Sequence, residues 1–459
     1  MMREPAFGLL RKPLPEALRS KTVLVLGLGD TGLSVARWVE SEGGRVRIAD
    51  TRAAPPRKPD FSGDFVAGRF TTALLEGVDL VCISPGLSLQ EPLVREAASR
   101  GIPVLGDVEL FAWHVRGATR SKVIAITGTN GKTTVTALTA HLLRSAGVDC
   151  ESAGNIGPAA LQALLARKAA PPTVWVLELS SYQLETTWSL EADAAALLNL
   201  TEDHLDRYGS VDEYGAAKAR VFLGDGVSIV NRDDPRALAL APARSTRMTF
   251  GLGAPPVGWD FGTLDGALVQ GREAFFLARE LRIHGEHNVA NALAACALAR
   301  AMGLSLESLS KGLRTFAGLP HRLQRVATRN GVEWYDDSKG TNVGATVAAL
   351  AGLRKPVLLI AGGEGKGQDF SPLALPVSQF ARRVLLIGRD APLIDQALGS
   401  TGVPIVRCAS LEEAVEHAAR EAAPGDAVLL SPACASFDMF RDYRHRGEVF
   451  AAAVKRLGA

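Results

Sequence analysis

The sequence is poor in cysteine and contains no long apolar run. Its 459 residues include five cysteines, which lie far apart and form no C-x-x-C pair. This spacing argues against a disulfide framework or a zinc cluster. No apolar run reaches the roughly 18 residues of a membrane-spanning helix, and the first 20 residues carry Glu4 and Glu16, unlike a secretory signal. We therefore expect a cytoplasmic protein with reduced thiols and no membrane partner.

The chain also lacks an excess of either charge. Its 51 basic and 49 acidic residues give a net charge of +2. This balance excludes a strongly basic nucleic-acid surface as the main feature, so no nucleic acid partner is expected. The length is too great for one hydrophobic core and predicts about two to four domains. Nothing in the sequence indicates an oligomer, and we expect a monomer.

The most informative stretch lies at residues 122–134. An apolar run at residues 123–126 leads into G-T-N-G-K-T-T, and helical spacing follows at residues 135–145. Backbone N–H groups and the helix dipole can hold a phosphate at such a turn, with a lysine charge and a threonine hydroxyl for magnesium. The loop is a shortened P-loop, because Ile126 stands where the first glycine is usual. The predicted nucleotide-binding residues are Gly128, Thr129, Asn130, Gly131, Lys132, Thr133 and Thr134.

A second glycine-rich turn lies near the N-terminus. Gly27, Gly29 and Gly32 form G-x-G-x-x-G, and Asp50 ends the next apolar run. The pattern suits a Rossmann dinucleotide site, another nucleotide, or only close helix-to-strand packing. A further predicted strand at residues 78–83 ends in Ser-Pro-Gly, at the edge where open α/β sheets bind ligands. We expect this domain to span residues 1–112.

Polar residues follow two apolar strands in the next part of the chain. Residues 173–179 carry Glu178, which is costly in a buried strand unless it is paired or binds metal. The alternative is a solvated glutamate on an edge strand. A cluster of acidic residues and a histidine follows residues 194–200. It is typical of a metal-binding or phosphate-binding site, but the charged first turn of a helix would have the same composition. Its members are Glu202, Asp203, His204 and Asp206.

Three more features of this part have ordinary interpretations. Lys218 lies in Ala-Ala-Lys-Ala and by itself indicates a surface lysine. Short alternating runs within residues 251–277 predict a small antiparallel patch. Asn288 and Asn291 lie one turn apart on a predicted helix, where they can simply cap it.

The last part, from about residue 318, repeats the strand-and-helix alternation. Apolar strands are predicted at residues 332–335, 356–361, 384–387, 405–407 and 427–430. Their spacing is that of βαβ units and indicates a second Rossmann-like sheet.

The order of the motifs is more specific than any one of them. The chain contains GTNGKTT, AGNIG, ELSSYQLET, NLTEDHLDRY, AAKAR, GEHNVANALAA, GLPHR, DDSKGTN, GGEGKG and SPACASFDMF. This series resembles the Mur ligases, the ATP-dependent amide ligases of peptidoglycan precursor synthesis, over the whole chain after about residue 20. The resemblance implies an α/β fold with three domains: a Rossmann-like domain (1–112), a P-loop ATPase-like domain (113–317) and a Rossmann-like domain (318–459).

Within the family the chain looks most like the branch that adds D-glutamate to UDP-N-acetylmuramoyl-L-alanine. GLGDTG and Asp50-Thr51-Arg52 resemble the domain that holds the UDP of that substrate, and not NAD. The D-N-P-R motif usual in the diaminopimelate- or lysine-adding branch is absent. The residues implied in binding this substrate are Asp30, Thr31, Asp50, Thr51, Arg52, Ser84, Gly86, Asn155 and His204.

The implied reaction passes through an acyl phosphate that the amine of D-glutamate attacks. Lys132, Glu178, His204 and Lys218 match the catalytic positions, and Lys218 matches a lysine that carbon dioxide carbamylates. Thr133, Glu178, His204 and the carbamate would serve two Mg²⁺ sites. Asn291, Arg322 and Asp337 are implied for ATP, with domain closure to complete the site. D-Glutamate would contact Lys339, Thr341, Lys366, Ser436 and Tyr443.

Several alternatives remain open at this stage. Tyr443 stands where phenylalanine is frequent, and Glu364 where aspartate is common. A related ligase with another acceptor, an NAD-dependent oxidoreductase and a regulatory nucleotide-binding protein are the competing hypotheses. The sequence does not distinguish D- from L-glutamate.

Overall fold

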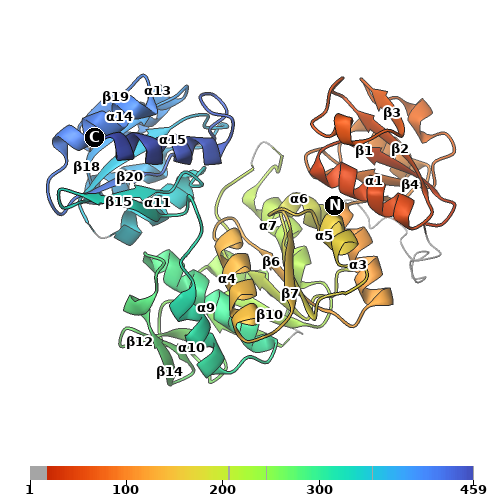
Figure 1. Ribbon diagram of the computed structural model, residues 1–459, viewed down its shortest axis with the longest axis horizontal. Helices are drawn as coiled ribbons and strands as arrows, with labels where there is room; N and C mark the ends of the chain where they lie inside the picture. Colours follow the sequence, from red (N-terminus) through yellow and green to blue (C-terminus); the bar gives the residue numbers. More distant parts are fainter. Residues whose placement is uncertain (1–17, 205–206, 244–245, 354, 458–459) are drawn as a thin grey trace.

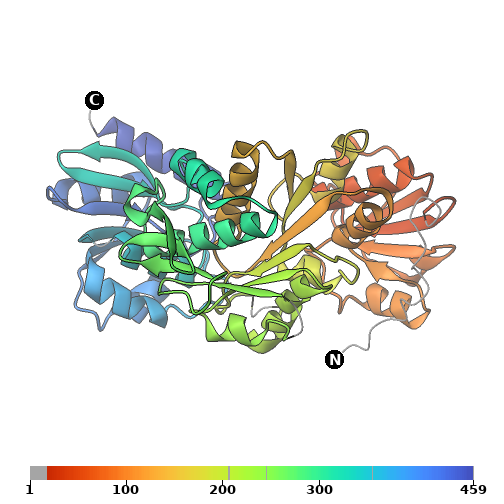
Figure 2. The ribbon, with the colours of Figure 1, turned by 90° about the horizontal axis from the view of Figure 1, so that it is seen from below.

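The computed structural model describes residues 18–204, 207–243, 246–353 and 355–457. Residues 1–17 of the N-terminal stretch and Asp206 therefore lie outside the described residues. Within those residues the strands form three sheets, of five, nine and six strands. The N-terminal and C-terminal sheets lie on either side of the nine-stranded one (Figure 1), at opposite ends of the molecule when it is seen from below (Figure 2).

The N-terminal sheet is a parallel Rossmann-like sheet in the order β3-β2-β1-β4-β5. Its strands are β1 (Thr22–Leu26), β2 (Arg45–Asp50), β3 (Asp64–Ala67), β4 (Leu80–Ile83) and β5 (Val104–Leu105). Its helices are α1 (Asp30–Ser41), α2 (Pro92–Ser99) and α3 (Asp107–Ala118). The expected domain boundary at residue 112 falls inside α3.

The central sheet has the order β14-β13-β12-β11-β10-β9-β6-β8-β7, parallel except for its last hairpins β12 to β14. Its strands are β6 (Lys122–Thr127), β7 (Cys150–Gly154), β8 (Val174–Glu178), β9 (Ala194–Leu197), β10 (Val227–Asn231), β11 (Arg247–Phe250), β12 (Phe261–Leu264), β13 (Ala267–Gln270) and β14 (Glu273–Leu277). The antiparallel patch is thus present. Strand β8 is paired on both sides, so the edge-strand interpretation of Glu178 is wrong.

The helices of this central part are α4 (Lys132–Ser145), α5 (Ala160–Ala166), α6 (Ser181–Glu185), α7 (Val211–Ala219), α8 (Pro235–Ala239), α9 (Glu286–Ala301) and α10 (Leu306–Thr315). Helix α4 leaves the turn after β6 and packs against α9 and β7. The segment 201–204 precedes α7 and is not helical, so Glu202, Asp203 and His204 do not form the first turn of a helix.

The C-terminal sheet has the order β15-β16-β20-β17-β18-β19. All its pairs are parallel except β15 with β16, and the sequence analysis missed β15. Its strands are β15 (Gln324–Arg329), β16 (Val332–Asp336), β17 (Val357–Gly362), β18 (Ala381–Ile387), β19 (Ile405–Arg407) and β20 (Ala427–Leu430). Its helices are α11 (Val343–Leu353), α12 (Ala374–Phe380), α13 (Ala391–Leu398), α14 (Leu411–Glu421) and α15 (Tyr443–Arg456).

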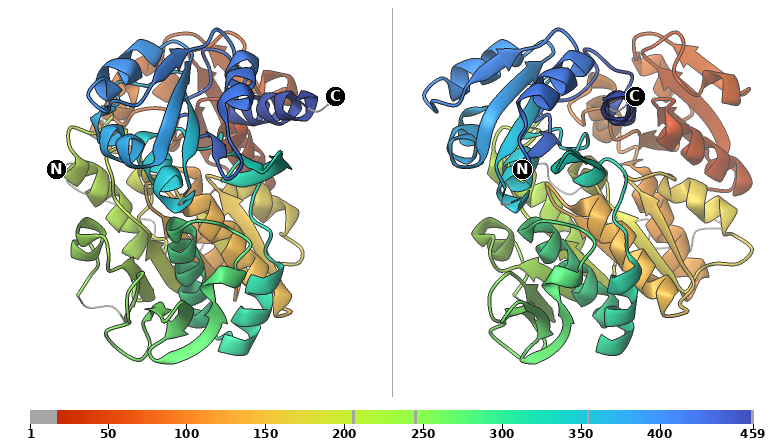
Figure 3. Two further views of the ribbon diagram at one scale, coloured as in Figure 1. Left: turned by 90° about the vertical axis from the view of Figure 1, so that its left-hand side faces the viewer. Right: turned by 60° about the vertical axis from the view of Figure 1, so that its left-hand side comes forward.

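The apolar cores show which parts are joined most firmly. One cluster contains Trp38 of α1, Phe111 of α3 and Trp175 of β8, and so runs from the N-terminal sheet into the central one. The rings of Phe111 and Trp175 meet edge to face, with centroids 5.2 Å apart. The clusters of the C-terminal sheet contain only residues 323–454, and the chain reaches this part through the segment after α10 (Figure 3). The C-terminal part therefore has apolar cores of its own.

Two expectations from composition can be compared with the structure. All five cysteines are free and buried. None of the helices in the described ranges has the length and apolar character needed to cross a membrane.

Candidate active site

The turn between β6 and α4 forms the centre of the site. Gly131 has a φ of +82°, a left-handed conformation that glycine adopts without steric cost. A Cβ on Gly131 would also lie 2.4 Å from the side-chain oxygen of Asn291, so a larger residue would displace the Asn291 side chain. Helix α4 begins at Lys132, and no described side chain caps its first turn. The N–H groups of that turn are therefore available to an anion.

Part of the loop is used for internal bonding. The backbone N–H of Thr129 donates to the carbonyl of Asn199 at 3.0 Å, and that of Asn130 donates to Asn199 Oδ1 at 2.8 Å. These two amides are therefore engaged within the protein, and the predicted nucleotide contacts of Thr129 and Asn130 stay a prediction. Asn199 was missed because its role depends on β9 lying beside β6.

Lys132 and Lys218 converge on one carbonyl. Lys132 Nζ donates to the carbonyls of Gly128 and Thr129, both at 2.8 Å, and Lys218 Nζ donates to Gly128 at 2.9 Å. Lys218 is 1% exposed, so its interpretation as a surface lysine is wrong. Burial, together with the charge of Lys132, lowers the pKa of Lys218 well below its usual value.

Glu178 supplies the negative charge among these cations. Its Oε1 accepts a hydrogen bond from Asn155 Nδ2 at 2.8 Å. Its Oε2 is buried and has no hydrogen-bond partner among the described residues. Burial lowers the pKa of four surrounding cations, and the charge of Glu178 offsets part of this effect. They are Lys132, Lys218, Arg322 and Lys339. A buried, unpaired carboxylate oxygen suits a divalent cation.

His204 lies within a group of aromatic rings. Its Nδ1 is 2.8 Å from Tyr182 Oη, and its ring also packs against Tyr214. The Lys218 Nζ lies 4.5 Å from the centre of that same Tyr214 ring. Tyr214 therefore stands between two predicted site residues. Sequence reasoning missed Tyr214, because an aromatic residue in a helix usually belongs to the hydrophobic core.

A cavity of about 230 Å³ is lined by the central and C-terminal parts. Predicted ATP-binding residues in its lining are Asn130, Gly131, Thr134, Asn291, Arg322 and Asp337. Asp337 accepts hydrogen bonds from Leu323 N at 3.1 Å and Ser431 Oγ at 2.7 Å. Burial raises the pKa of Asp337 to about 7.

The two asparagines of α9 do not cap it. Asn288 Nδ2 donates to the carbonyl of His284 at 2.7 Å, and Asn291 Nδ2 donates to Asn288 Oδ1 at 3.0 Å. No described side chain accepts from the first N–H groups of this helix. The capping interpretation is wrong, and both amides line the cavity instead.

The loops at the carboxyl ends of β16, β17 and β20 lie side by side. Glu364 and Ala435 form a two-residue antiparallel bridge, which brings the segments of Lys366 and Ser436 together. Ala433 N donates to Gly340 O at 2.9 Å, beside Thr341. Lys366 is exposed, whereas Ser436 is buried.

Lys339 and Tyr443 complete this group. Lys339 Nζ lies 4.1 Å from the centre of the Tyr443 ring. Burial, with the charge of Arg322, lowers the pKa of Lys339 to about 8. Behind them, the fully buried Arg446 donates to the Ser338 Oγ and carbonyl and to the carbonyls of Cys434 and Ala435. It holds two of the loops in place, and sequence reasoning missed it.

A larger cavity, of about 620 Å³, lies between the N-terminal and central parts. Its lining includes Asp30, Thr31, Asp50, Thr51, Arg52, Ser84, Gly86 and Asn155, that is, every predicted UDP-substrate residue except His204. It also contains Arg57, Phe70, Gln162 and Gln183, which were not predicted. Asp50 accepts hydrogen bonds from the Arg52 side chain and, at 2.8 Å, from Leu28 N. The bond from Arg52 is the main cause that lowers the pKa of the Asp50 carboxyl group to about 2. Its carboxylate shapes the cavity wall.

A sheet with a P-loop between two Rossmann-like sheets, with one cavity where it meets each neighbouring part, defines the chain as a three-domain α/β protein of the nucleotide-binding class. The chain belongs to the Mur ligase family. The Mur ligase middle domain matches residues 126–299, the MurD-like N-terminal domain residues 21–106, and the Mur ligase glutamate ligase domain residues 321–434. The resemblance stated from the motifs is thereby confirmed, and neither the oxidoreductase nor the regulatory hypothesis accounts for it.

Similar proteins support membership of the Mur ligase family over nearly the full length of the chain. UDP-N-acetylmuramoylalanine--D-glutamate ligase of Nitrosospira multiformis is 54% identical over 96% of this chain and 97% of its own. The same-named protein of Nitrosomonas europaea is 52% identical over 95% and 96%.

Solved structures share the fold. UDP-N-acetylmuramate-alanine ligase MurC of Thermotoga maritima superposes with a TM-score of 0.60 at 18% identity, over 95% of this chain and 99% of that one. MurF of Acinetobacter baumannii gives a TM-score of 0.58 at 20% identity, over 96% and 92%. The expected three-domain α/β fold is confirmed.

Proposed function

We propose that this chain joins D-glutamate to the carboxyl group of UDP-N-acetylmuramoyl-L-alanine, with ATP converted to ADP and phosphate. The observation that carries the proposal is the 54% identity, over almost the whole chain, to a ligase named for this reaction. The two cavities, which meet the central sheet from either side, supply room for a nucleotide sugar and for ATP.

ATP would lie with its phosphates at the start of α4. Lys132 and the uncapped N–H groups of the first turn carry positive charge toward the phosphates. Asn291, Arg322 and Asp337 line the adjoining cavity and would contact the remainder of the nucleotide. Because Arg322 and Asp337 belong to the C-terminal part, that part must be in place for ATP to be held fully.

Magnesium fits the donors near Glu178. Thr133, Glu178, His204 and a carbamate on Lys218 would hold two Mg²⁺ ions, and the unpaired Glu178 Oε2 is the observation that supports this. Bound Mg²⁺ supplies positive charge that offsets the repulsion between a carboxylate and a triphosphate.

The burial of Lys218 supports the proposed carbamate. A protonated lysine cannot attack carbon dioxide, whereas a neutral amine can. The Nζ lone pair would form a bond to the CO₂ carbon, and the proton on nitrogen would pass to water. The buried Lys218, with its lowered pKa, is suited to this step.

The reaction then needs two displacements. A carboxylate oxygen of UDP-N-acetylmuramoyl-L-alanine attacks the γ-phosphorus, and ADP leaves as the acyl phosphate forms. The D-glutamate amine attacks the acyl carbon, phosphate is expelled, and the amine proton passes to solvent. Lys132, Arg322 and Lys339 stabilise the charge that develops. Closure of the C-terminal part would exclude water from the acyl phosphate.

The two substrates would approach from different domains. UDP-N-acetylmuramoyl-L-alanine would occupy the 620 Å³ cavity, with Asn155 and His204 toward its alanine end. D-Glutamate would lie among Lys339, Thr341, Lys366, Ser436 and Tyr443, where two lysines can pair with its carboxylates. We also propose that the protein acts as a cytoplasmic monomer, in keeping with its free, buried cysteines.

The test is phosphate release from ATP and Mg²⁺ with UDP-N-acetylmuramoyl-L-alanine and a series of amino acids. Release should require D-glutamate and fail with L-glutamate, D-alanine or meso-diaminopimelate. Lys132→Ala should lower kcat at least about 100-fold, whereas Lys122→Ala, an exposed lysine at the start of β6, should not. Phosphate release with another amino acid would show that the enzyme has a different amino-acid specificity. No release with any amino acid would refute the proposal.

A further inference from the structure

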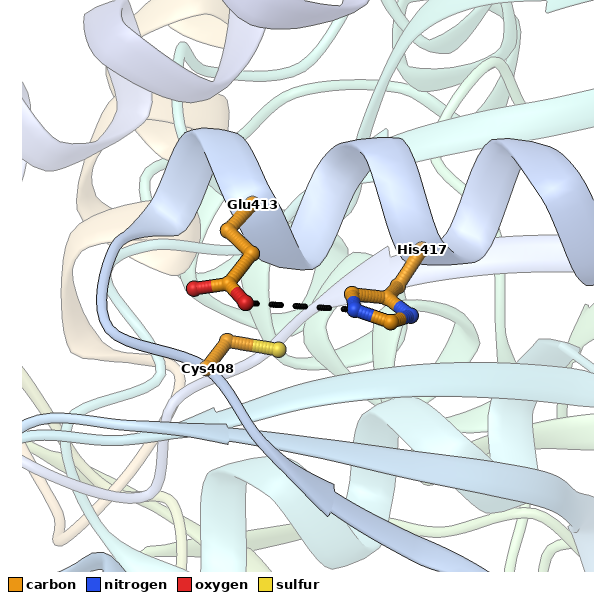
Figure 4. Close-up of side chains that lie close together, drawn as sticks. All are labelled: Cys408, Glu413 and His417. Carbon is orange, nitrogen blue, oxygen red and sulfur yellow. Dashed lines mark ion pairs between the residues drawn. The ribbon is translucent and has the colours of Figure 1, made fainter.

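Three side chains of different chemistry converge at the edge of the C-terminal sheet. Cys408 follows β19, and Glu413 and His417 lie one turn apart on α14 (Figure 4). The Cys408 Sγ, a Glu413 carboxylate oxygen and a His417 ring nitrogen all lie within 4.8 Å of one another. Glu413 Oε1 and His417 Nε2 are 3.9 Å apart. Cys408 is 8% exposed, and the other two are half-buried.

The backbone fixes these side chains. Cys408 N donates to Leu386 O of β18 at 2.8 Å. Ser410 caps α14 by accepting from Glu413 N at 3.1 Å. Glu413 Oε2 in turn accepts from Ala409 N at 2.6 Å. The bond from Ala409 N engages one oxygen of Glu413, and the other, Oε1, is the one that faces His417. Glu413 and His417 share one face of α14 because they are four residues apart, and the end of β19 brings Cys408 to the same point.

We propose that Cys408, Glu413 and His417 bind a divalent transition metal of the Zn²⁺ type, with water as a fourth ligand. Thiolate, imidazole and carboxylate together match the ligands that zinc takes in tetrahedral sites. Magnesium prefers oxygen ligands alone, so this site differs in chemistry from one that would serve ATP. The metal–sulfur bond forms as the thiol S–H bond breaks, and the proton passes to solvent.

A divalent cation between the Cys408 sulfur and the Glu413 carboxylate would bind Cys408 as the thiolate. It would also tie the end of β19 to the first turns of α14, and so strengthen an edge strand of only three residues.

The site does not touch the proposed ligase machinery. It lies beyond β18 at the outer edge of the sheet, whereas Lys366 and Ser436 follow β17 and β20, nearer its middle. Variants of the three ligands should therefore retain phosphate release. Failure of the metal proposal and failure of the ligase proposal are thus separate results.

The experiment is a titration of the full-length, tag-free protein with Co²⁺, followed by absorption spectroscopy. The wild type should gain a thiolate-to-cobalt charge-transfer band that saturates at one equivalent. Cobalt held only by oxygen and nitrogen, as at a magnesium site, has no such band. Zn²⁺ should bleach the band, and excess Mg²⁺ should leave it. A wild type without the band, or displacement by Mg²⁺, would overturn the proposal.

Single-residue variants test whether Cys408, Glu413 and His417 are the ligands of the cobalt that gives this band. Cys408→Ser should abolish it, and His417→Ala should weaken Co²⁺ binding at least about tenfold. Glu413→Gln keeps an acceptor for Ala409 N, so it removes the ligand charge while retaining the helix cap. Matched controls are Glu412→Gln on the same helix and Cys150→Ser, another buried thiol, and both should behave as wild type. A band that persists in Cys408→Ser would contradict the assignment.

Discussion

Asn342 Nδ2 donates a hydrogen bond to Asn130 Oδ1 across 3.1 Å. Asn130 belongs to the phosphate loop and Asn342 to the loop after β16, so this bond joins the C-terminal part directly to the P-loop. Asn342 Oδ1 also accepts from Ala345 N at 2.9 Å, which fixes the amide at the start of α11. The position of the C-terminal part is therefore coupled to the conformation of the phosphate loop.

A double-mutant cycle should detect this coupling. Asn130→Ala and Asn342→Ala should each lower kcat/KM for ATP several-fold, and the double variant should be little worse than the poorer single one. The expected coupling energy is about 0.5–1.5 kcal/mol, since one hydrogen bond is removed by either change. Strictly additive effects in steady-state kinetics would show that the bond does not link the two parts.

We predict that a side chain at Gly131 impairs ATP binding through a steric clash. Gly147, which has a similar backbone conformation but no such clash, is the control. Gly131 and Gly147 have φ of +82° and +80°, but a Cβ would meet Asn291 at 2.4 Å in the first case and nothing within 4 Å in the second. Both alanine variants should lose about 1–2 kcal/mol of stability. Only Gly131→Ala should raise the KM for ATP, by at least about tenfold. Equal KM values in the two variants would refute the steric argument.

Lys218 should react with carbon dioxide in the folded protein. With ¹³C-bicarbonate, the wild type should show a carbamate carbon signal by NMR, and Lys218→Arg should not, because a guanidinium stays protonated. The variant should lose at least about 100-fold in kcat. Lys311→Arg, an exposed lysine paired with Glu307, is the control. Full activity in Lys218→Arg would exclude the carbamate from catalysis.

His321 should make stability depend on pH. Its Nδ1 lies 2.7 Å from Asp336 Oδ2, and this hydrogen bond raises the pKa of His321 above 6.5. A raised histidine pKa stabilises the fold fully below the unfolded pKa, and the effect is lost as pH rises through the folded value. The Tm difference between wild type and His321→Asn should therefore shrink from about pH 6 to about pH 9.

The same comparison has an internal check. Asp336→Asn removes the partner and should abolish the pH-dependent part of that difference. A Tm difference that stays constant across the pH range would mean that His321 acts only through packing.

The sequence predicted features that depend on neighbouring residues along the chain. The phosphate loop, several strands of each sheet and the family motifs were predictable because hydrophobic period and turn chemistry are local. The strand at residues 405–407, for example, was predicted with the bounds of β19. The loop position of Lys366 was also clear from its glycine-rich setting.

Local reasoning failed where a residue's environment comes from distant elements. Lys218 is an ordinary helical lysine in sequence, and only the packing of α7 against the β6 turn buries it. Tyr214 and Arg446 have no local signal at all, since one lies between Lys218 and His204 and the other holds loops from two strands.

The sequence by itself thus determined the fold class, the family and the reaction type, because these follow from motif order and the types of side chain. Tertiary structure alone decided which groups are buried, which carboxylate oxygen is unpaired, and which loops meet. Those properties set the pKa of Lys218 and bring Cys408 to His417. They depend on solvent exclusion and on distances across the fold, which spacing along a chain does not encode.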